Sequence, residues 1–448
     1  MDKVRIGNAC GFWGDDPQAP AHLATGGNLD FLTLEYLAEL TMSILAHQKA
    51  KNPQAGYAGD FITVLQSLIL SLKAQPRLKM VTNAGGMNPL ACAKKAKEVL
   101  DQAGIVRRIG YLTGDDLLDR LPDFIRQGIA LENLDDGRPL EPFLSRVVSA
   151  NAYLGSEGIV QLLEQGAEIV ITGRVADACL TVGPAAWHFQ TPLEDWNTLA
   201  GFSVAGHLIE CGAQVTGGNF TRWQEVPRYE SVGYPIAEIS SDGSFLLTKP
   251  QGTGGLVNFE TVAEQLLYEV GDPSAYLTPD VSADFTSVEI QDIGSDRVQV
   301  GKAKGRPKPP LLKVSLAYRD GFMASGTLVA GGGKAREKAE CCGQIIREKL
   351  RQANALPQEF LVEILGAGDS LPGIYQRNDP PEAVLRLAAR DPSKGIIERF
   401  TREFAPLVTS GPQGITGYTS GRPQVREVFR YWPTTIPRDL VPFQLGFL

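Results

Sequence analysis

Polar residues follow several short β-branched segments in the N-terminal half of the chain: three asparagines, an aspartate and one arginine. The residues concerned are Asn8, Asn83, Asn151, Arg174 and Asp177. Arginine can bind a carboxylate through two parallel hydrogen bonds, and an aspartate can act as general acid or base. The set favours a site for a small acidic metabolite, with Asp177 catalytic and Asn8, Asn83, Asn151 and Arg174 binding substrate. The same loops also carry Asp15, Asp16, Asp115 and Asp116.

Each of these residues also has a purely structural interpretation. Asn and Asp are common in turns and at helix N-caps, which occur wherever a strand leads into a helix. Arg174 and Asp177 have the i,i+3 spacing of an ion pair at a helix start. The functional interpretation rests on the whole set, because five polar loops at one edge of a sheet are harder to explain as turns than any single loop.

A second group of polar residues lies on a predicted helix around position 207. His207, Glu210, Cys211 and Gln214 fall at i, i+3, i+4 and i+7, so they share one helical face. We expect His207 and Glu210 to form an exposed acid/base pair, with Gln214 binding substrate and Cys211 acting as a nucleophile only if its pKa is depressed. The alternative is a buried, hydrogen-bonded histidine beside a packing cysteine.

A glycine-rich turn precedes the predicted helix at 258–270. Its sequence KPQGTGG, residues 249–255, could cradle an anion through backbone N–H groups, with Lys249, Thr253 and Gly254 in contact. The turn matches neither the P-loop nor the dinucleotide-binding pattern, so a plain turn is the alternative.

The sequence gives little support for a cofactor. Its four histidines form no H-x-x-x-H or H-x-H pair, and no Cys/His cluster has zinc spacing. Mg²⁺ bound by carboxylates stays open, since such sites leave little spacing signature. No G-x-S-x-G nucleophile motif is present. We therefore identify no cofactor.

The elements that would position these residues alternate between strands and helices. Strands are predicted at 4–8, 78–83, 107–112, 146–151 and 168–173. Helical spacing marks 89–104 and 156–167, and 30–48 is predicted to be a strand that runs into a helix. This pattern predicts an α/β fold with a mostly parallel, doubly wound sheet, because too few strands are present for a barrel.

The second half of the chain has the signals of antiparallel structure. Asp242-Gly243 and Asp320-Gly321 each lie between two strand-like segments, which predicts two hairpins. The segment 311–366 predicts a ββαβ order. We expect an α/β domain over residues 1–225 that carries the site, and an α+β domain over 226–448.

Composition excludes several classes of partner. Lys plus Arg number 43 against 51 Asp plus Glu, and the net charge of -8 is spread along the chain, which argues against nucleic acid as partner. The longest apolar segment, 61–72, is too short to span a membrane. Six scattered cysteines indicate reduced thiols. We expect a cytoplasmic protein.

Several sequence blocks in order along the chain resemble the acyclic terpene utilisation protein A family. They are GNACGFWGD (7–15), GYAGDF (56–61), TNAGGMNP (82–89), ITGRVADACL (171–180), GHLIECGAQVTGG (206–218), KPQGTGG (249–255) and GPQGITGYTSGRP (411–423). Many members of that family carry an additional small ferredoxin-like C-terminal domain, which this chain is expected to lack or to receive from a separate protein.

The resemblance implies a place in the catabolism of branched acyclic terpenoids and related acids, through coenzyme A thioesters and alongside acyl-CoA carboxylases. Taken with the polar loops, it favours lyase or hydratase-like acid-base chemistry on a carboxylate or an acyl-CoA substrate. The alternative is a non-catalytic subunit that binds an acyl-CoA or an acyl-CoA carboxylase. A homo-oligomer without membrane contact is expected in either case.

Overall fold

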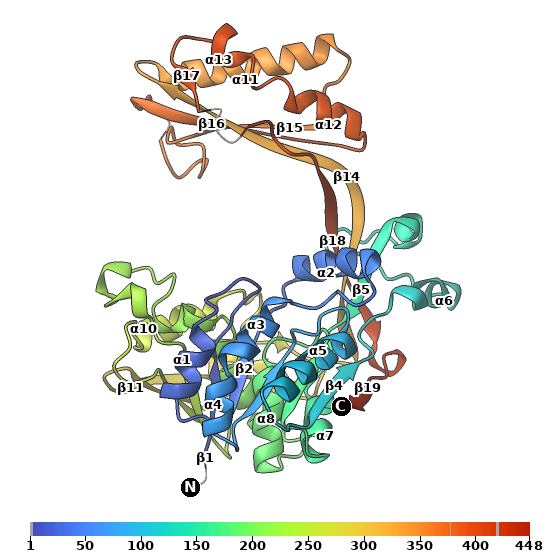
Figure 1. The fold of residues 1–448 in the computed structure, drawn as a ribbon, viewed down its shortest axis with the longest axis vertical. Helices are drawn as coiled ribbons and strands as arrows, with labels where there is room; N and C mark the ends of the chain where they lie inside the picture. The colour runs from blue at the N-terminus through green and yellow to red at the C-terminus, as the bar shows by residue number, and fades with distance from the viewer. Residues whose placement is uncertain (1–2, 377, 418–420) are drawn as a thin grey trace. The chain divides into compact units, whose positions relative to one another are not determined.

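The computed structural model describes residues 3–376, 378–417 and 421–448, shown in Figure 1. The chain divides into two compact units: unit 1 comprises the chain up to residue 317 together with 431–448, and unit 2 comprises 318–430. The boundary that we expected near residue 225 does not coincide with this division. The reason is that strands beyond residue 225 pair with the first strand of the chain and extend its sheet.

Five parallel strands form the middle of the large sheet in unit 1. In spatial order they are β1 (Lys3–Asn8), β2 (Phe31–Leu34), β3 (Lys79–Thr82), β6 (Ile169–Thr172) and β4 (Ile109–Thr113). Parallel strands buried on both faces need continuous apolar sequence, and every residue of β2 and β6 is buried. The α/β class is therefore confirmed.

Antiparallel strands flank this parallel block on both sides. Beside β1 lie β7 (Ile236–Ser240), β8 (Phe245–Thr248), β12 (Arg297–Gly301) and β11 (Glu289–Gly294), and β19 (Gln444–Phe447) lies beside β4. The hairpin predicted at Asp242-Gly243 is confirmed by the pairing of β7 with β8. The sheet as a whole is mixed rather than mostly parallel.

One predicted strand lies outside this sheet. Residues 146–151 do form a strand, β5 (Val147–Ala152), but it pairs with β14 (Leu311–Gly331). A small separate sheet contains β9 (Tyr276–Leu277), β10 (Ser282–Asp284) and β13 (Lys304–Arg306).

Two groups of helices pack against the large sheet. One consists of α1 (Ala19–Gly26), α3 (Asp60–Ser67), α4 (Ile69–Ala74) and α5 (Pro89–Gln102), and the other of α7 (Glu157–Glu164), α8 (Cys179–Phe189) and α9 (Trp196–Glu210). The remaining helices of unit 1 are α2 (Glu39–Lys51), α6 (Leu121–Arg126) and α10 (Phe259–Leu267). Because α9 packs against α8, α10, β10 and β13, it has no solvent-facing side, and its residues from Thr198 onward are buried.

Unit 2 has the topology of a ferredoxin-like fold. After β14 come α11 (Ala335–Gln352), β15 (Glu359–Leu365), β16 (Glu382–Asp391), α12 (Lys394–Thr401), α13 (Leu407–Ser410) and β17 (Ile415–Thr416). The sheet order β15-β16-β14-β17 is antiparallel throughout, as a βαββαβ unit requires. The chain leaves this unit through β18 (Arg426–Pro437), which pairs with β14.

The hairpin predicted at Asp320-Gly321 is wrong, since β14 runs straight through this dipeptide. A two-residue hairpin turn of the Asp-Gly type needs positive φ at both residues, whereas here only Gly321 has it, with φ of 86°. Residues 322–331 pair instead with β16, and the Asp320 carboxylate accepts a hydrogen bond from Arg390 at 2.9 Å. The order over residues 311–366 is therefore βαβ (β14, α11, β15) instead of the predicted ββαβ.

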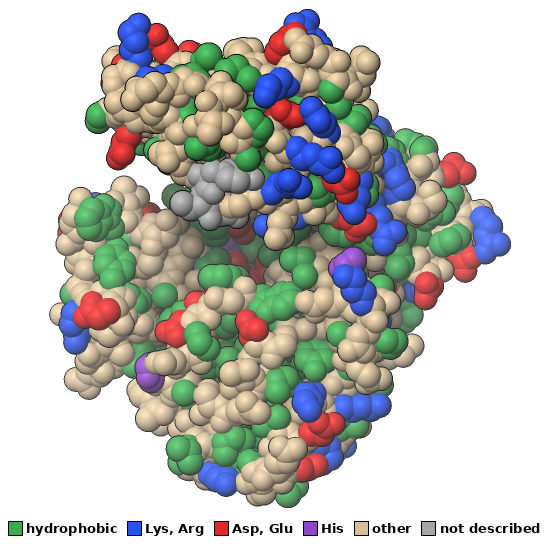
Figure 2. Space-filling view, turned by 45° about the horizontal axis from the view of Figure 1, so that its top comes forward, with side chains coloured by type: hydrophobic (Ala, Val, Ile, Leu, Met, Phe, Trp, Pro, Cys, Tyr) green, Lys and Arg blue, Asp and Glu red, His purple; other side chains and the backbone are tan. Residues whose placement is uncertain are grey.

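On the face shown in Figure 2, several Lys and Arg side chains gather on one part, with Asp and Glu side chains among them, and hydrophobic side chains are scattered over the rest. Within the described residues, no helix is both long enough and apolar enough to cross a membrane.

Candidate functional site

Arg174 lies at the centre of a buried polar cluster beyond the end of β6. Its side chain is 2% exposed. One guanidinium nitrogen donates to the carbonyl oxygen of Leu37 at 2.7 Å, the other donates to Asp177 at 2.7 Å, and the group stacks 4.1 Å from the ring centre of Tyr153. The i,i+3 ion pair considered above is therefore present. A substrate carboxylate could reach the guanidinium fork only by displacing the chain's own groups.

Glu35 is a member of this cluster that our sequence reasoning missed. It follows β2, and its Oε1 accepts hydrogen bonds from the Leu37 amide at 2.9 Å and from the Asn83 side chain, with Arg174 at 3.9 Å. Burial, and next the charge of Asp177, raise the pKa of Glu35 well above its usual range. Its position directly after a strand could have identified it as a candidate. The end of that strand could not be predicted, because the boundary between strand and helix within 30–48 was unclear.

Asn83 and Asn8 hold parts of the chain in place. The Asn83 carbonyl accepts from the Tyr36 amide at 2.8 Å while its NH₂ group donates to Glu35. The Asn8 NH₂ group donates to the carbonyl oxygens of Ile209 and Glu210, each at 2.8 Å. Asn8 thus fixes the last turn of α9 against the end of β1, which is a positioning role. The side-chain oxygen of Asn8 accepts a hydrogen bond from Thr33 at 3.1 Å. Both polar groups of this side chain are therefore already engaged within the protein, which does not favour the predicted role in substrate binding.

Asp115 connects Asn151 to the same cluster. Although β5 lies outside the parallel block, Asn151 donates to Asp115 at 2.8 Å, and the backbone N–H of Arg174 donates to the same oxygen at 2.9 Å. Burial raises the pKa of Asp115 to about 6. Among the described residues, the Asn151 carbonyl oxygen has no hydrogen-bond partner.

His207 and Glu210 form a buried contact rather than the exposed pair that we expected. They are 1% and 9% exposed, because α9 is covered on all sides. His207 Nδ1 lies 3.2 Å from Glu210 Oε1, and Nε2 lies 3.0 Å from the carbonyl oxygen of Gln265. A carbonyl oxygen only accepts, so Nε2 carries a hydrogen and the Nδ1–Oε1 contact must contain the mobile proton.

The protonation of this pair is set by opposing effects. Burial raises the pKa of Glu210 to about 7, with the contact to His207 acting in the other direction. Burial lowers the pKa of His207, but the contact with the Glu210 carboxyl outweighs it and leaves the pKa raised. The pair therefore holds a proton near neutral pH.

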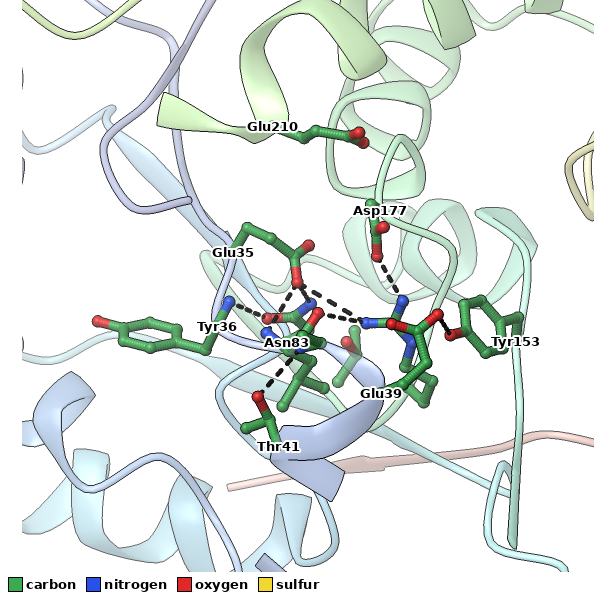
Figure 3. A network of polar contacts seen from close by, with 12 residues as sticks. Glu35, Tyr36, Glu39, Thr41, Asn83, Tyr153, Asp177 and Glu210 are labelled. Carbon is green, nitrogen blue, oxygen red and sulfur yellow. Dashed lines mark hydrogen bonds and ion pairs between the residues drawn. The ribbon is translucent and has the colours of Figure 1, made fainter. Parts of the chain in front are cut away.

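Three carboxyl groups from different elements lie in the same region, as Figure 3 shows for Glu35, Asp177 and Glu210. The charge of Asp177 raises the pKa of both glutamates, so the three groups are electrostatically linked. The Oε2 atoms of Glu35 and Glu210 are buried without a hydrogen-bond partner in the described part of the chain. Asp177, whose side chain is 34% exposed, connects the cluster to solvent.

A second ion pair borders the cluster beside Tyr153. The Tyr153 hydroxyl donates to Glu39 at 2.8 Å, and Lys313 Nζ lies 3.1 Å from the same oxygen. Although burial acts to raise it, Lys313 and Tyr153 bring the pKa of Glu39 down to about 2. Both cations near the cluster are thus paired: Arg174 with Asp177, and Lys313 with Glu39. No spacing in the sequence connects position 313 to position 39.

Two predicted members of the second group differ from expectation. Burial raises the pKa of Cys211 to about 12, which opposes a nucleophilic role. Helix α9 ends at Glu210, and Gln214 lies in the following 3₁₀ turn (Gly212–Thr216), so the helical face assumed for Gln214 does not continue that far.

The glycine-rich turn at 249–255 is occupied by the chain's own groups. Lys249 pairs with Asp296 at 3.0 Å and donates to the carbonyl oxygen of Thr253 at 3.1 Å. The backbone N–H of Gly254 donates to the carbonyl oxygen of Ser231 at 2.7 Å. At the start of α10, the Phe259 amide donates to Asp292 and the Val257 amide to Asp296. Internal carboxylates thus take the place that a bound anion would have had.

Within the described ranges, no group of three His, Cys, Asp or Glu side chains has an arrangement that could hold a metal ion. The proposed Mg²⁺ alternative gains no support from the geometry.

The fold and the cluster define a mixed α/β protein with a buried carboxyl site at the carboxyl ends of parallel strands, where ligands bind in open α/β sheets. The family model of the acyclic terpene utilisation family protein AtuA matches residues 4–447, so the chain belongs to this family. No significant match was found among curated proteins or among solved structures. Membership implies a role in acyclic terpene utilisation.

Proposed function

We propose that the chain is an enzyme that adds water to, or removes it from, a branched acid or its coenzyme A thioester derived from an acyclic terpenoid. The observation that carries this proposal is the cluster of Glu35, Asp177 and Glu210, in which burial and the charge of Asp177 raise the pKa of both glutamates. A buried carboxyl group that holds its proton near neutral pH, beside a more exposed carboxyl group, is suited to act as the acid of an acid-base pair.

In the dehydration direction, Asp177 accepts the proton from the carbon next to the carbonyl group as that C–H bond breaks. The double bond forms as the C–O bond of the hydroxyl group breaks, and Glu210 gives its proton to the departing hydroxyl, which leaves as water. A pKa of about 7 suits Glu210 to this task, because the group is protonated and still acidic at neutral pH. His207 then acts as a positioning residue that tunes Glu210. Hydration is the reverse of these steps.

The charge balance of the cluster suggests which part of the substrate it receives. Arg174 and Lys313 are each paired with a carboxylate, so a free substrate carboxylate would meet no unpaired cation among them. Among the described residues, the buried cluster atoms without a hydrogen-bond partner include the acceptors Glu35 Oε2, Glu210 Oε2 and the Asn151 carbonyl oxygen, and one donor, Arg174 Nε. Buried polar atoms of this kind need a hydrogen-bond partner. A substrate hydroxyl group can donate to one of these oxygens, and a thioester carbonyl can accept from a protonated Glu35 or Glu210 or from Arg174 Nε.

Incubation of the purified protein with branched hydroxy acids, branched unsaturated acids and their coenzyme A thioesters tests the proposal, with gain or loss of one water followed by mass spectrometry. Turnover should fall by about 10²–10⁴-fold in Glu210→Gln and in Asp177→Asn. Glu98→Gln is the matched control, because Glu98 is exposed on α5 and forms an ion pair with Lys95. Loss of activity in the control, or full activity in either cluster variant, would contradict the proposal.

A further inference from the structure

We infer that a second pocket, at the carboxyl ends of β1 and β2, binds a small alkylammonium ion. The pocket has a volume of about 330 Å³. Its lining comes from the loop after β1, from the residue after Glu35 and from the start of α3, and consists of Cys10, Gly14, Asp15, Asp16, Pro17, Pro20, Tyr36, Asp60, Thr63 and Val64. The inference is independent of the water-transfer reaction proposed above.

Three carboxylates give this pocket a negative charge. Within residues 3–376, 378–417 and 421–448, no lysine, arginine or histidine forms an ion pair with Asp15, Asp16 or Asp60. Asp15 accepts only neutral donors, among them the Tyr234 hydroxyl at 2.6 Å and the Gly11 amide at 2.8 Å. The negative charge also affects a neighbouring residue. Burial raises the pKa of Tyr234, and the contact with Asp15 is the next largest effect that raises it.

The Tyr36 hydroxyl is a buried polar group that lacks a partner. Tyr36 is 2% exposed, and its hydroxyl has no hydrogen-bond partner among the described residues. The neighbouring Cys10 thiol is directed to the carbonyl oxygen of Phe12 at 3.2 Å. Figure 3 shows the Tyr36 ring pointing away from Glu35 and Asn83, so its hydroxyl belongs to the pocket and not to the carboxyl cluster. A buried hydroxyl without a partner is costly unless a ligand supplies one.

These features fit an ammonium group on a short hydrocarbon. An ammonium carries positive charge and three hydrogen-bond donors, which the carboxylates and the Tyr36 oxygen can accept. Pro17, Pro20 and Val64 supply apolar wall for a few methylene groups. A bare metal ion fits less well, because no group of three ligating side chains is arranged for one in the described ranges.

Calorimetric titration of the full chain with butylammonium tests the inference, with 1-butanol and butyrate as ligands of similar size and different charge. Butylammonium should bind at least about tenfold more tightly than either. Asp60→Asn should weaken its binding about two- to fivefold, as for an exposed ion pair. Tyr36→Phe should weaken it about two- to tenfold, as for one hydrogen bond.

Asp101→Asn serves as control, because Asp101 is exposed on α5 and pairs with Lys97. Thermal melts show whether each variant is folded. Equal affinity for butylammonium and butanol, or unchanged affinity in a folded Asp60→Asn protein, would overturn the inference. Tighter binding of Mg²⁺ than of butylammonium to the same pocket would also overturn it, since the site would then select an inorganic ion.

Discussion

His207 Nδ1 and Glu210 Oε1 lie 3.2 Å apart, one turn apart on α9. The contact is enclosed by the rings of Tyr276 and Phe285, each with its centre 5.3 Å from that of the imidazole. His207 and Glu210 are 1% and 9% exposed, so the pair is shielded from bulk solvent and each group affects the pKa of the other. The pH dependence of activity and stability should therefore report on this pair.

Replacing His207 by Asn should move the alkaline limb of the pH–activity profile to higher pH. The contact with His207 lowers the pKa of Glu210, so its loss raises that pKa further above about 7. A general acid works only while protonated, and activity should therefore persist to higher pH in the variant, with a lower maximum. Rates measured from pH 5 to pH 10 provide the check. An alkaline limb at the wild-type position would show that Glu210 is not the acid.

The free energy of unfolding should fall as pH rises from about 4 to about 7. Buried Glu35, Asp115 and Glu210 have raised pKa values in the native state, about 6 for Asp115 and about 7 for Glu210. The native state thus binds more protons than the unfolded chain in this window, and stability is lost as pH rises through these values. Asp115 and Glu210 each account for up to about 3 kcal/mol.

Asp115→Asn should remove its share of this pH dependence, because asparagine does not titrate. Urea unfolding at pH 5 and at pH 8 measures the difference, and Asp101→Asn, on the exposed face of α5, should leave it unchanged. If Asp115→Asn shows the same difference between pH 5 and pH 8 as the wild type, Asp115 does not contribute to the pH dependence of stability.

Arg174→Met should cost about 3–5 kcal/mol of stability, since it leaves Asp177 and the carbonyl oxygen of Leu37 without their buried partner. Arg174→Lys should lie between wild type and Met, because an ammonium keeps the charge but cannot reproduce the planar fork stacked on Tyr153. Urea unfolding of the three proteins gives the order. Wild-type stability in Arg174→Met would mean that the network contributes nothing to the fold.

Gly321→Ala should destabilise unit 2 by about 1–3 kcal/mol, the usual cost of a strained backbone conformation. Gly321 has φ of 86°, and an added Cβ would meet the carbonyl oxygen of Asp391 at 2.6 Å. Gly373 shares a φ of 86° but has open space around it, so Gly373→Ala isolates the steric part. Hydrogen exchange of β14 and β16 is the readout. Equal protection in the two variants would show that the close approach at Gly321 is relaxed at no cost.

The strand positions were largely predictable, because strands that are buried on both faces have continuous apolar, β-branched sequences. Strands β1, β3, β4 and β6 lie within a residue or two of their predicted positions. Pairing was harder to predict. Strand β5 is paired with β14, and β14 passes through Asp320-Gly321, because partners far away in sequence, rather than local turn preference, decide which strand a segment joins.

The carboxyl cluster was predictable only in part. Polar residues after strands indicated Arg174, Asp177, Asn83 and Asn151, and helical spacing indicated the contact between His207 and Glu210. Spacing could not show that α9 is buried on every side, since this depends on β10, β13 and α10 from later in the chain. The roles of Glu35 and Lys313 likewise follow from contacts between distant segments.

The most direct test of the central claim is solvent deuterium incorporation into product, measured in heavy water for any branched substrate that the protein converts. In the hydration direction, deuterium should appear at the carbon next to the carbonyl group of the wild-type product, because Asp177, whose side chain is 34% exposed, delivers a solvent-derived proton to that carbon. The incorporation rate should fall at least about 10²-fold in Asp177→Asn and remain unchanged in Glu98→Gln. Incorporation at the wild-type rate in Asp177→Asn would contradict the assignment of the carboxyl cluster as the catalytic site.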